Sequence, residues 1–103
     1  MNLDNNVINY LEDLVMKIFQ PNFQSVLKAC NRYDFSNTKF YSDLGEGLLP
    51  PVIQIGARRV TTLEHETSSI IAARANGAND TQIKTLVKEL VEERSELLKG
   101  RLL

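Results

Sequence analysis

The chain has 103 residues, of which 43% are hydrophobic and 24% are charged, and this is the composition of one small globular domain. Its single cysteine excludes an internal disulfide and a cysteine-based zinc site, and no apolar run approaches the ~18 residues that suggest a membrane span. The N-terminus lacks the basic and apolar regions of a signal peptide, so we expect a cytoplasmic protein that does not engage membranes. The net charge is −1, but residues 26–62 hold five basic and three acidic residues and are the only positive part.

The first segment is amphipathic. Between Leu3 and Phe19 the apolar residues recur at spacings of three and four, which predicts a helix with Asp4 or Asn5 at its N-cap. Pro21 ends it, because a proline disfavours the α conformation in the residue before it. Two interpretations stay open: the helix covers the core of its own chain, or it contacts another protomer. Its apolar residues are Val7, Ile8, Leu11, Leu14, Val15, Ile18 and Phe19.

Two further helices are predicted on either side of a turn at residues 32–35. The first covers about Phe23 to Asn31, and the second covers about Asn37 to Glu46 with Ser36 as its N-cap. Gly45 and Gly47 supply the positive φ that a helix end often needs. The residues expected to face the core are Phe23, Val26, Leu27, Cys30, Phe40, Tyr41 and Leu44. Those expected to point outward are Asn37, Lys39, Ser42 and Asp43.

A hairpin and two more helices complete the pattern. Residues 52–55 read as a strand, 56–58 as a turn and 59–61 as a short return strand. Thr61 or Thr62 caps the next helix, and Thr61 with Glu64 fits the spacing of a capping box. That helix ends near Gly77 and buries Leu63, Ile70, Ile71 and Ala73, and Asn79 with Gln82 fits a second box. The last helix has an apolar stripe: Ile83, Leu86, Val87, Leu90, Val91, Leu97 and Leu98. The face opposite, expected in solvent, holds Lys84, Lys88, Glu89, Glu92, Glu93, Arg94 and Glu96.

This order of elements predicts a mainly α fold with a small β-hairpin, namely a winged helix-turn-helix at residues 23–77. Residues 1–22 and 78–103 are then N- and C-terminal helical extensions. In such a fold the second helix enters a DNA major groove and the hairpin tip reaches the neighbouring backbone. Short polar side chains on that helix suit base edges and phosphates, and arginines suit the hairpin tip. The candidate DNA-binding residues are Ser36, Asn37, Thr38, Lys39, Ser42, Arg58 and Arg59.

Several short motifs in this region also follow one another as in a known family. They are the segment Ser36–Tyr41, the Gly-x-apolar-Pro turn Gly47–Pro51, the wing pattern Val52–Arg58, the acidic pair Glu64 and Glu66, and the tail Ala72–Gly77. In this order they resemble the AlpA-type phage regulators, which belong with excisionases in the MerR-like winged-helix group. The chain departs from the pattern at three places: Asp34 replaces a glycine, Thr62 a tryptophan and Ile70 an aromatic residue.

The resemblance implies a small DNA-binding accessory protein of a phage, prophage or mobile element. Such proteins act as recombination directionality factors (excisionases) with a tyrosine integrase, as transcription regulators, or as both. They bind repeated double-stranded sites near an attachment site or a promoter, and the weak positive charge of one copy leads us to expect self-association. The alternative is a protein-interaction module on a winged-helix scaffold that does not bind DNA.

No group of residues in the sequence suggests catalysis, and we expect neither an enzyme nor a bound cofactor or metal. His65 lies between Glu64 and Glu66, but adjacent helix residues point about 100° apart and do not converge on one ligand. A histidine that faces solvent is the simpler interpretation.

Overall fold

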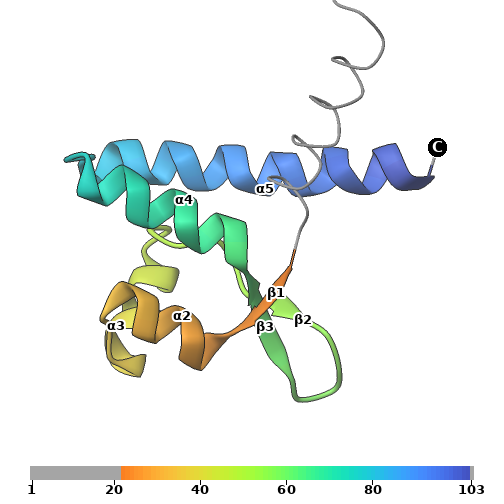
Figure 1. Ribbon diagram of the computed structural model, residues 1–103, viewed down its shortest axis with the longest axis horizontal. Coiled ribbons are helices and arrows are strands. Elements are labelled where there is room, and N and C mark those ends of the chain that lie inside the picture. Colours follow the sequence, from red (N-terminus) through yellow and green to blue (C-terminus); the bar gives the residue numbers. More distant parts are fainter. Residues whose placement is uncertain (1–21, 103) are drawn as a thin grey trace, which may run out of the picture.

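The computed structural model describes residues 22–102, with side chains up to residue 96 (Figure 1). This part is mainly helical and contains a small three-stranded antiparallel sheet. The N-terminal helix predicted at Leu3–Phe19 lies outside the described residues. The elements, in chain order, are β1 (Phe23–Ser25), α2 (Val26–Tyr33), α3 (Asn37–Gly45), β2 (Ile53–Gln54), β3 (Val60–Leu63), α4 (Glu64–Ala75) and α5 (Asp80–Leu102).

The sheet has the strand order β1-β3-β2, so the last strand in sequence lies in the middle. In β1, Gln24 pairs with Thr62 of β3, and β3 also pairs with β2 to form the hairpin. The hydroxyls of Thr61 and Thr62 both donate to the carbonyl oxygen of Gln24, each at 2.8 Å. These bonds give the two buried threonines partners and tie β1 to the hairpin.

Two predictions fail at this sheet. Phe23 was expected to begin a helix with its ring in the core, but it lies in β1 and its side chain is 62% exposed. The helix starts later because Ser25 caps it, its side chain accepting the N–H of Lys28 at 3.1 Å. The predicted capping box of Thr61 and Glu64 is also wrong, because Thr61 is in β3; α4 begins after Leu63 with no side-chain cap.

The α2–α3 turn depends on one residue with a left-handed backbone. Asp34 has φ 59° and ψ 41°, and its N–H bonds to carbonyl oxygens at the end of α2. Glycine adopts this conformation most readily, and Asp is among the few other residues that tolerate it. Ser36 then caps α3 as predicted, accepting the N–H of Lys39 at 3.1 Å.

The inner face of α3 differs from the prediction at two residues. Phe40 is fully buried, but Tyr41 is 50% exposed, while Asp43, expected in solvent, is 4% exposed. Positions 40 and 43 lie one turn apart on the face toward the core, which turns Tyr41 outward. Of the two glycines expected to have positive φ only Gly47 does, at 79°, because Gly45 still belongs to the helix.

One hydrophobic core joins the three-helix part to α5. It is formed by Ala29, Cys30, Phe40, Leu48, Leu49, Ile70, Ile83, Val87 and Leu90. Leu27, predicted to be part of it, is 67% exposed, and Ile71 and Ala73 are half-buried. The capping box before α5 is confirmed, since the backbone N–H of each of Asn79 and Gln82 donates to the side chain of the other at 2.9 Å.

Arg94 was predicted to face solvent, and this prediction is wrong. Its guanidinium binds both carboxylate oxygens of Glu66, with Nε 2.7 Å from Oε2, and its Nη2 donates to the carbonyl oxygen of Pro51 at 2.8 Å. Glu66 is 2% exposed, so this bidentate pair is largely removed from water. It fastens α5 to α4 and to the connector that leads into the hairpin.

Candidate nucleic-acid interface

The outward face of α3 is polar and open to solvent. Thr38, Tyr41 and Ser42 are separated by three and four residues, so they share one side of the helix, and all three are exposed. Asn37 precedes them in the first turn and is also exposed, although its Oδ1 accepts a weak bond from the Cys30 thiol at 3.6 Å. This face carries hydroxyl and amide groups and one aromatic ring. Tyr41 was missed because a short helix leaves little periodicity to separate its two faces.

Two of the predicted site residues on α3 already have partners. The Ser36 side chain is engaged as the N-cap. The Lys39 ammonium binds Asp43 Oδ1 at 2.8 Å and lies 5.5 Å from the centre of the Phe35 ring. The hydrogen bond to Asp43 raises the pKa of Lys39, whose side chain is 54% exposed. Lys39 is therefore a positioned cation whose charge is partly balanced by a buried carboxylate.

Arg58 and Arg59 lie in the loop that joins β2 to β3, and both are exposed. The loop is closed by the N–H of Ile55, which donates to the carbonyl oxygen of Arg59 at 3.0 Å. The amide of Gln54 also donates to the carbonyl oxygen of Gly56 at 3.1 Å. Among the residues that the structure describes, neither arginine forms an ion pair within 4.0 Å, so both guanidinium groups can meet an outside anion.

The fold places α3 and the hairpin loop on the same side of the molecule. In Figure 1 both lie at the side away from α5, with α2 between α3 and the sheet that carries the loop. The predicted site residues thus form two separate groups, one on α3 and one on the loop. A surface with two such groups can meet an extended ligand at two places, which a small pocket cannot do.

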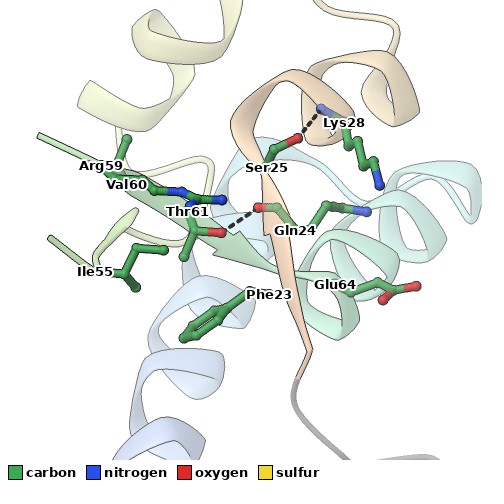
Figure 2. A pocket seen from close by; sticks show the side chains of 9 residues that line it. All are labelled: Phe23, Gln24, Ser25, Lys28, Ile55, Arg59, Val60, Thr61 and Glu64. Atoms are coloured by element: carbon green, nitrogen blue, oxygen red, sulfur yellow. Dashed lines mark hydrogen bonds between the residues drawn. The ribbon is translucent and has the colours of Figure 1, made fainter.

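A groove of about 470 Å³ runs beside β1 and the hairpin (Figure 2). Phe23, Ile55 and Arg59 project on one side of β1 in Figure 2, while Lys28 lies on the other side near the start of α2. Lys28 was not among the predicted site residues, because nothing local in the sequence indicates that the first turn of α2 comes close to the hairpin. The exposed rings and side chains of Phe23 (62%), Ile55 (40%) and Val60 (39%) make the groove partly apolar.

Two other polar residues are Arg32, which links two helices, and His65, which is less exposed than predicted. The guanidinium of Arg32 donates to Ser68 Oγ at 2.6 Å and to the carbonyl oxygen of Glu64 at 3.2 Å, so it links α2 to α4. His65, predicted to face solvent, is half-buried, and its Nδ1 is shielded from water. Glu66 beside it is turned toward Arg94, whereas Glu64 is exposed, so the three side chains occupy different surroundings.

Comparisons with known proteins give no match: no protein-family model, no curated protein and no solved structure matches this chain. Within residues 22–102 there is no helix with the length and apolar character needed to cross a membrane. In the same part of the chain no three His, Cys, Asp or Glu side chains are grouped so as to hold a metal ion.

Proposed function

We propose that this protein is a small double-stranded DNA-binding protein with a winged helix-turn-helix. In this proposal α2 and α3 are the helix-turn-helix, α3 is the recognition helix, and β2, β3 and their loop are the wing. The observation that carries it is the position of two exposed groups on one side of the molecule. One is the polar face of α3, and the other is the pair Arg58 and Arg59. Recognition of DNA needs both kinds of contact, with base edges and with the phosphate backbone.

The AlpA-type resemblance gives this proposal a more specific form. The protein then serves a phage, prophage or other mobile element in the cytoplasm, as an excisionase that works with a tyrosine integrase, as a transcription regulator, or as both. The left-handed Asp34, which stands where the pattern has glycine, supports the resemblance at the turn between the helices.

We further propose that several copies act together on neighbouring DNA sites. A single recognition helix and two loop arginines neutralise few phosphates, so one copy binds weakly, and contacts between copies multiply that affinity. α5 supports this part of the proposal, because its C-terminal part extends beyond α4 (Figure 1). Sedimentation of the free protein and of its complexes with one-site and two-site duplexes tests it. Independent occupancy of two adjacent sites contradicts it.

A gel-shift series tests DNA binding itself. The wild-type chain is titrated against the attachment and promoter regions of its own element and against a scrambled duplex, between about 50 and 200 mM salt. We expect a preference for one of the native regions and an affinity that falls steeply with salt. The variant Lys84→Ala/Lys88→Ala removes two exposed charges from α5 and serves as the matched control, with affinity close to wild type.

The exposed apolar residues favour a second candidate function, a protein-interaction module that does not bind DNA. Phe23 and Leu27 are both more than 60% exposed, so each offers a large apolar side chain to a partner protein. Equal, weak binding to every duplex, together with a complex formed with the element's integrase, is the result that selects this function.

A further inference from the structure

Two contacts hold the side chain of Lys39 in place. Its ammonium donates to Oδ1 of Asp43 at 2.8 Å, and Asp43 is 4% exposed, so this acceptor is fixed inside the domain. The same ammonium lies 5.5 Å from the centre of the Phe35 ring, which is within the range of a cation–π contact. Phe35 in turn stacks on Tyr33, with ring centroids 5.1 Å apart, and Tyr33 packs against the core. A surface lysine usually samples many rotamers, whereas these contacts restrict this one.

The held ammonium is nevertheless open to a ligand. An ammonium has three N–H donors, of which Asp43 engages one, and the Lys39 side chain is 54% exposed. Lys39 is the third residue of α3, and it borders the exposed polar face at Thr38 and Ser42. In a helix-turn-helix the N-terminal residues of the recognition helix are those that meet base edges. Lys39 therefore has free, oriented donors at the end of α3 that suits a base contact.

The charge of the pair favours a base over a phosphate. Lys39 and Asp43 together carry no net charge, whereas attraction to the DNA backbone depends on cations that are not already neutralised. Guanine presents two neighbouring acceptors in the major groove, O6 and N7. Adenine places an amino donor beside its N7, and cytosine presents an amino donor. A side chain that can only donate therefore prefers guanine.

We propose that Lys39 reads a guanine through O6 and N7, and that Phe35 and Asp43 are positioning residues that orient its ammonium for this contact. The proposal rests on the proposed DNA-binding function and gives it a base at one position. Lys39 then contributes to discrimination between sequences and little to affinity for random DNA, in contrast to Arg58 and Arg59.

Nuclear magnetic resonance of the free full-length chain tests the positioning without DNA. We expect nuclear Overhauser contacts between the ε-methylene protons of Lys39 and the ring protons of Phe35, and an upfield ring-current shift of those methylene protons. Phe35→Leu should abolish the shift, and Phe35→Tyr, which keeps a ring, should retain it. Lys88, on the exposed face of α5, supplies the reference in the same spectrum. Equal shifts for Lys39 and Lys88 overturn the positioning.

A duplex with one altered base tests the contact with guanine. The probe is the duplex that the gel-shift series selects, with one guanine at a time replaced by 7-deazaguanine, which lacks the N7 acceptor. We expect one position at which this change weakens wild-type binding by about fivefold or more. At that position Lys39→Ala/Asp43→Asn, which leaves no buried charge unpaired, should lose no further affinity. A variant that remains as sensitive as wild type overturns the proposal, and so does a duplex without any sensitive guanine.

Salt dependence separates a base contact from a phosphate contact. The slope of log affinity against log salt should be the same in wild type and in Lys39→Ala/Asp43→Asn. The matched control is Lys88→Ala/Glu92→Gln, which also removes one exposed cation and one carboxylate without changing the net charge. A slope that falls by about 0.9 in the Lys39 variant alone overturns the proposal, because Lys39 then meets a phosphate.

The role of Phe35 has a readout that a merely structural residue would not give. Phe35→Leu should reduce the preference for guanine over 7-deazaguanine by about two- to fivefold, while affinity for a scrambled duplex stays at the wild-type value. Phe35→Tyr should restore the preference. Equal losses on both duplexes overturn the positioning role. If no duplex is preferred over the scrambled one, the proposed function fails and the reading of guanine with it, while the resonance measurement still decides whether Lys39 is held.

Discussion

The Arg94 guanidinium on α5 holds both carboxylate oxygens of Glu66 on α4, although 28 residues separate them in the sequence. Glu66 is 2% exposed and the Arg94 side chain 21% exposed, so the pair sits where a lone charge is costly. The same guanidinium binds the carbonyl oxygen of Pro51, just before the hairpin. One side chain thus contacts α4 and the connector before the hairpin at once, and holds α5 against both.

Removal of Arg94 should be among the most destabilising single changes outside the apolar core. Arg94→Ala leaves the Glu66 carboxylate buried without its partner, and we expect it to lower the free energy of unfolding by about 3–5 kcal/mol. The double variant Glu66→Gln/Arg94→Gln should lose less, because no buried charge remains. Urea unfolding followed by circular dichroism measures both, with Lys88→Ala as control. A loss for Arg94→Ala no larger than for the control contradicts the structural role of the pair.

Asp34 offers a test of the turn between α2 and α3. Because its φ is 59°, Asp34→Ala should cost about 1 kcal/mol, while Asp34→Gly should be neutral or stabilising by a similar amount. Thermal unfolding of the two variants measures the difference. A variant with glycine that is less stable than the variant with alanine rules out a left-handed backbone at this position.

In the proposed function, the exposed face of α3 should determine which DNA sequences the protein prefers. Thr38→Ala and Ser42→Ala each remove an exposed hydroxyl, and Asn37→Ala removes an amide; a change at a base-contacting residue should cost about 1–3 kcal/mol of specific binding. Lys39 needs a different design, since Lys39→Ala alone leaves the buried Asp43 carboxylate unpaired. Lys39→Ala/Asp43→Asn avoids this. Specific affinity is compared with affinity for a scrambled duplex. Normal discrimination by the combined variant Asn37→Ala/Lys39→Ala/Asp43→Asn shows that another face reads the DNA.

In the proposed function, Arg58 and Arg59 should strengthen binding to every DNA sequence by a similar factor, because they meet the phosphate backbone. Arg58→Ala/Arg59→Ala removes two cations that lack ion pairs among the described residues, so the slope of log affinity against log salt should fall by about 1.8. Specific and non-specific binding should weaken together. The matched double variant Lys84→Ala/Lys88→Ala keeps the wild-type slope. An unchanged slope in the wing variant means that these arginines do not meet phosphates.

The phenol of Tyr33 should lose its proton at a higher pH than an exposed tyrosine does. Burial raises the pKa of Tyr33 from its ordinary value of 10.0 to about 12. Because the folded pKa lies above the unfolded one, the stabilising effect is complete below pH about 10 and is lost as the pH rises through about 12, with a total of about 3 kcal/mol. The difference in ultraviolet absorbance between wild type and Tyr33→Phe across this range reports the titration. A Tyr33 signal centred near pH 10 in the folded protein argues against the buried position.

Local signals predicted much of the helical framework. Ser36 and the pair of Asn79 and Gln82 mark helix starts by bonds that span only three residues, so the sequence alone shows them. The strand at Phe23–Ser25 was missed because its partner is β3, some forty positions later, and a capping serine hidden inside an apolar stretch looks like part of a helix. The Arg94–Glu66 pair was missed for the same reason: on a helix surface, a charge that pairs across the fold looks like one in solvent.

Of the candidate site, the sequence predicted the arginines of the hairpin loop but not which residues of α3 are exposed. Arg58 and Arg59 follow Gly56 at a hairpin tip, a local pattern that does not depend on the rest of the fold. The exposure of Tyr41 and the burial of Asp43 depend on how α3 is rotated against the core, which packing with α2 and the connector decides. The groove between α2 and the hairpin joins segments that are distant in sequence, and only the assembled sheet reveals it.

The strand order also determines when the sheet can form as the chain is being synthesised, because β1 pairs with the later strand β3. The carbonyl oxygen of Gln24 accepts a hydrogen bond from the hydroxyl of Thr62, so this bond cannot form until 38 further residues have been synthesised. At the usual pace of synthesis of about 5–20 residues per second, that wait is roughly two to eight seconds. The caps of α2 and α3 need only their own neighbours and can form meanwhile, whereas β1 stays without its ladder until the hairpin has been made. The pairing of β1 therefore depends on a part of the chain that is made well after α2 and α3.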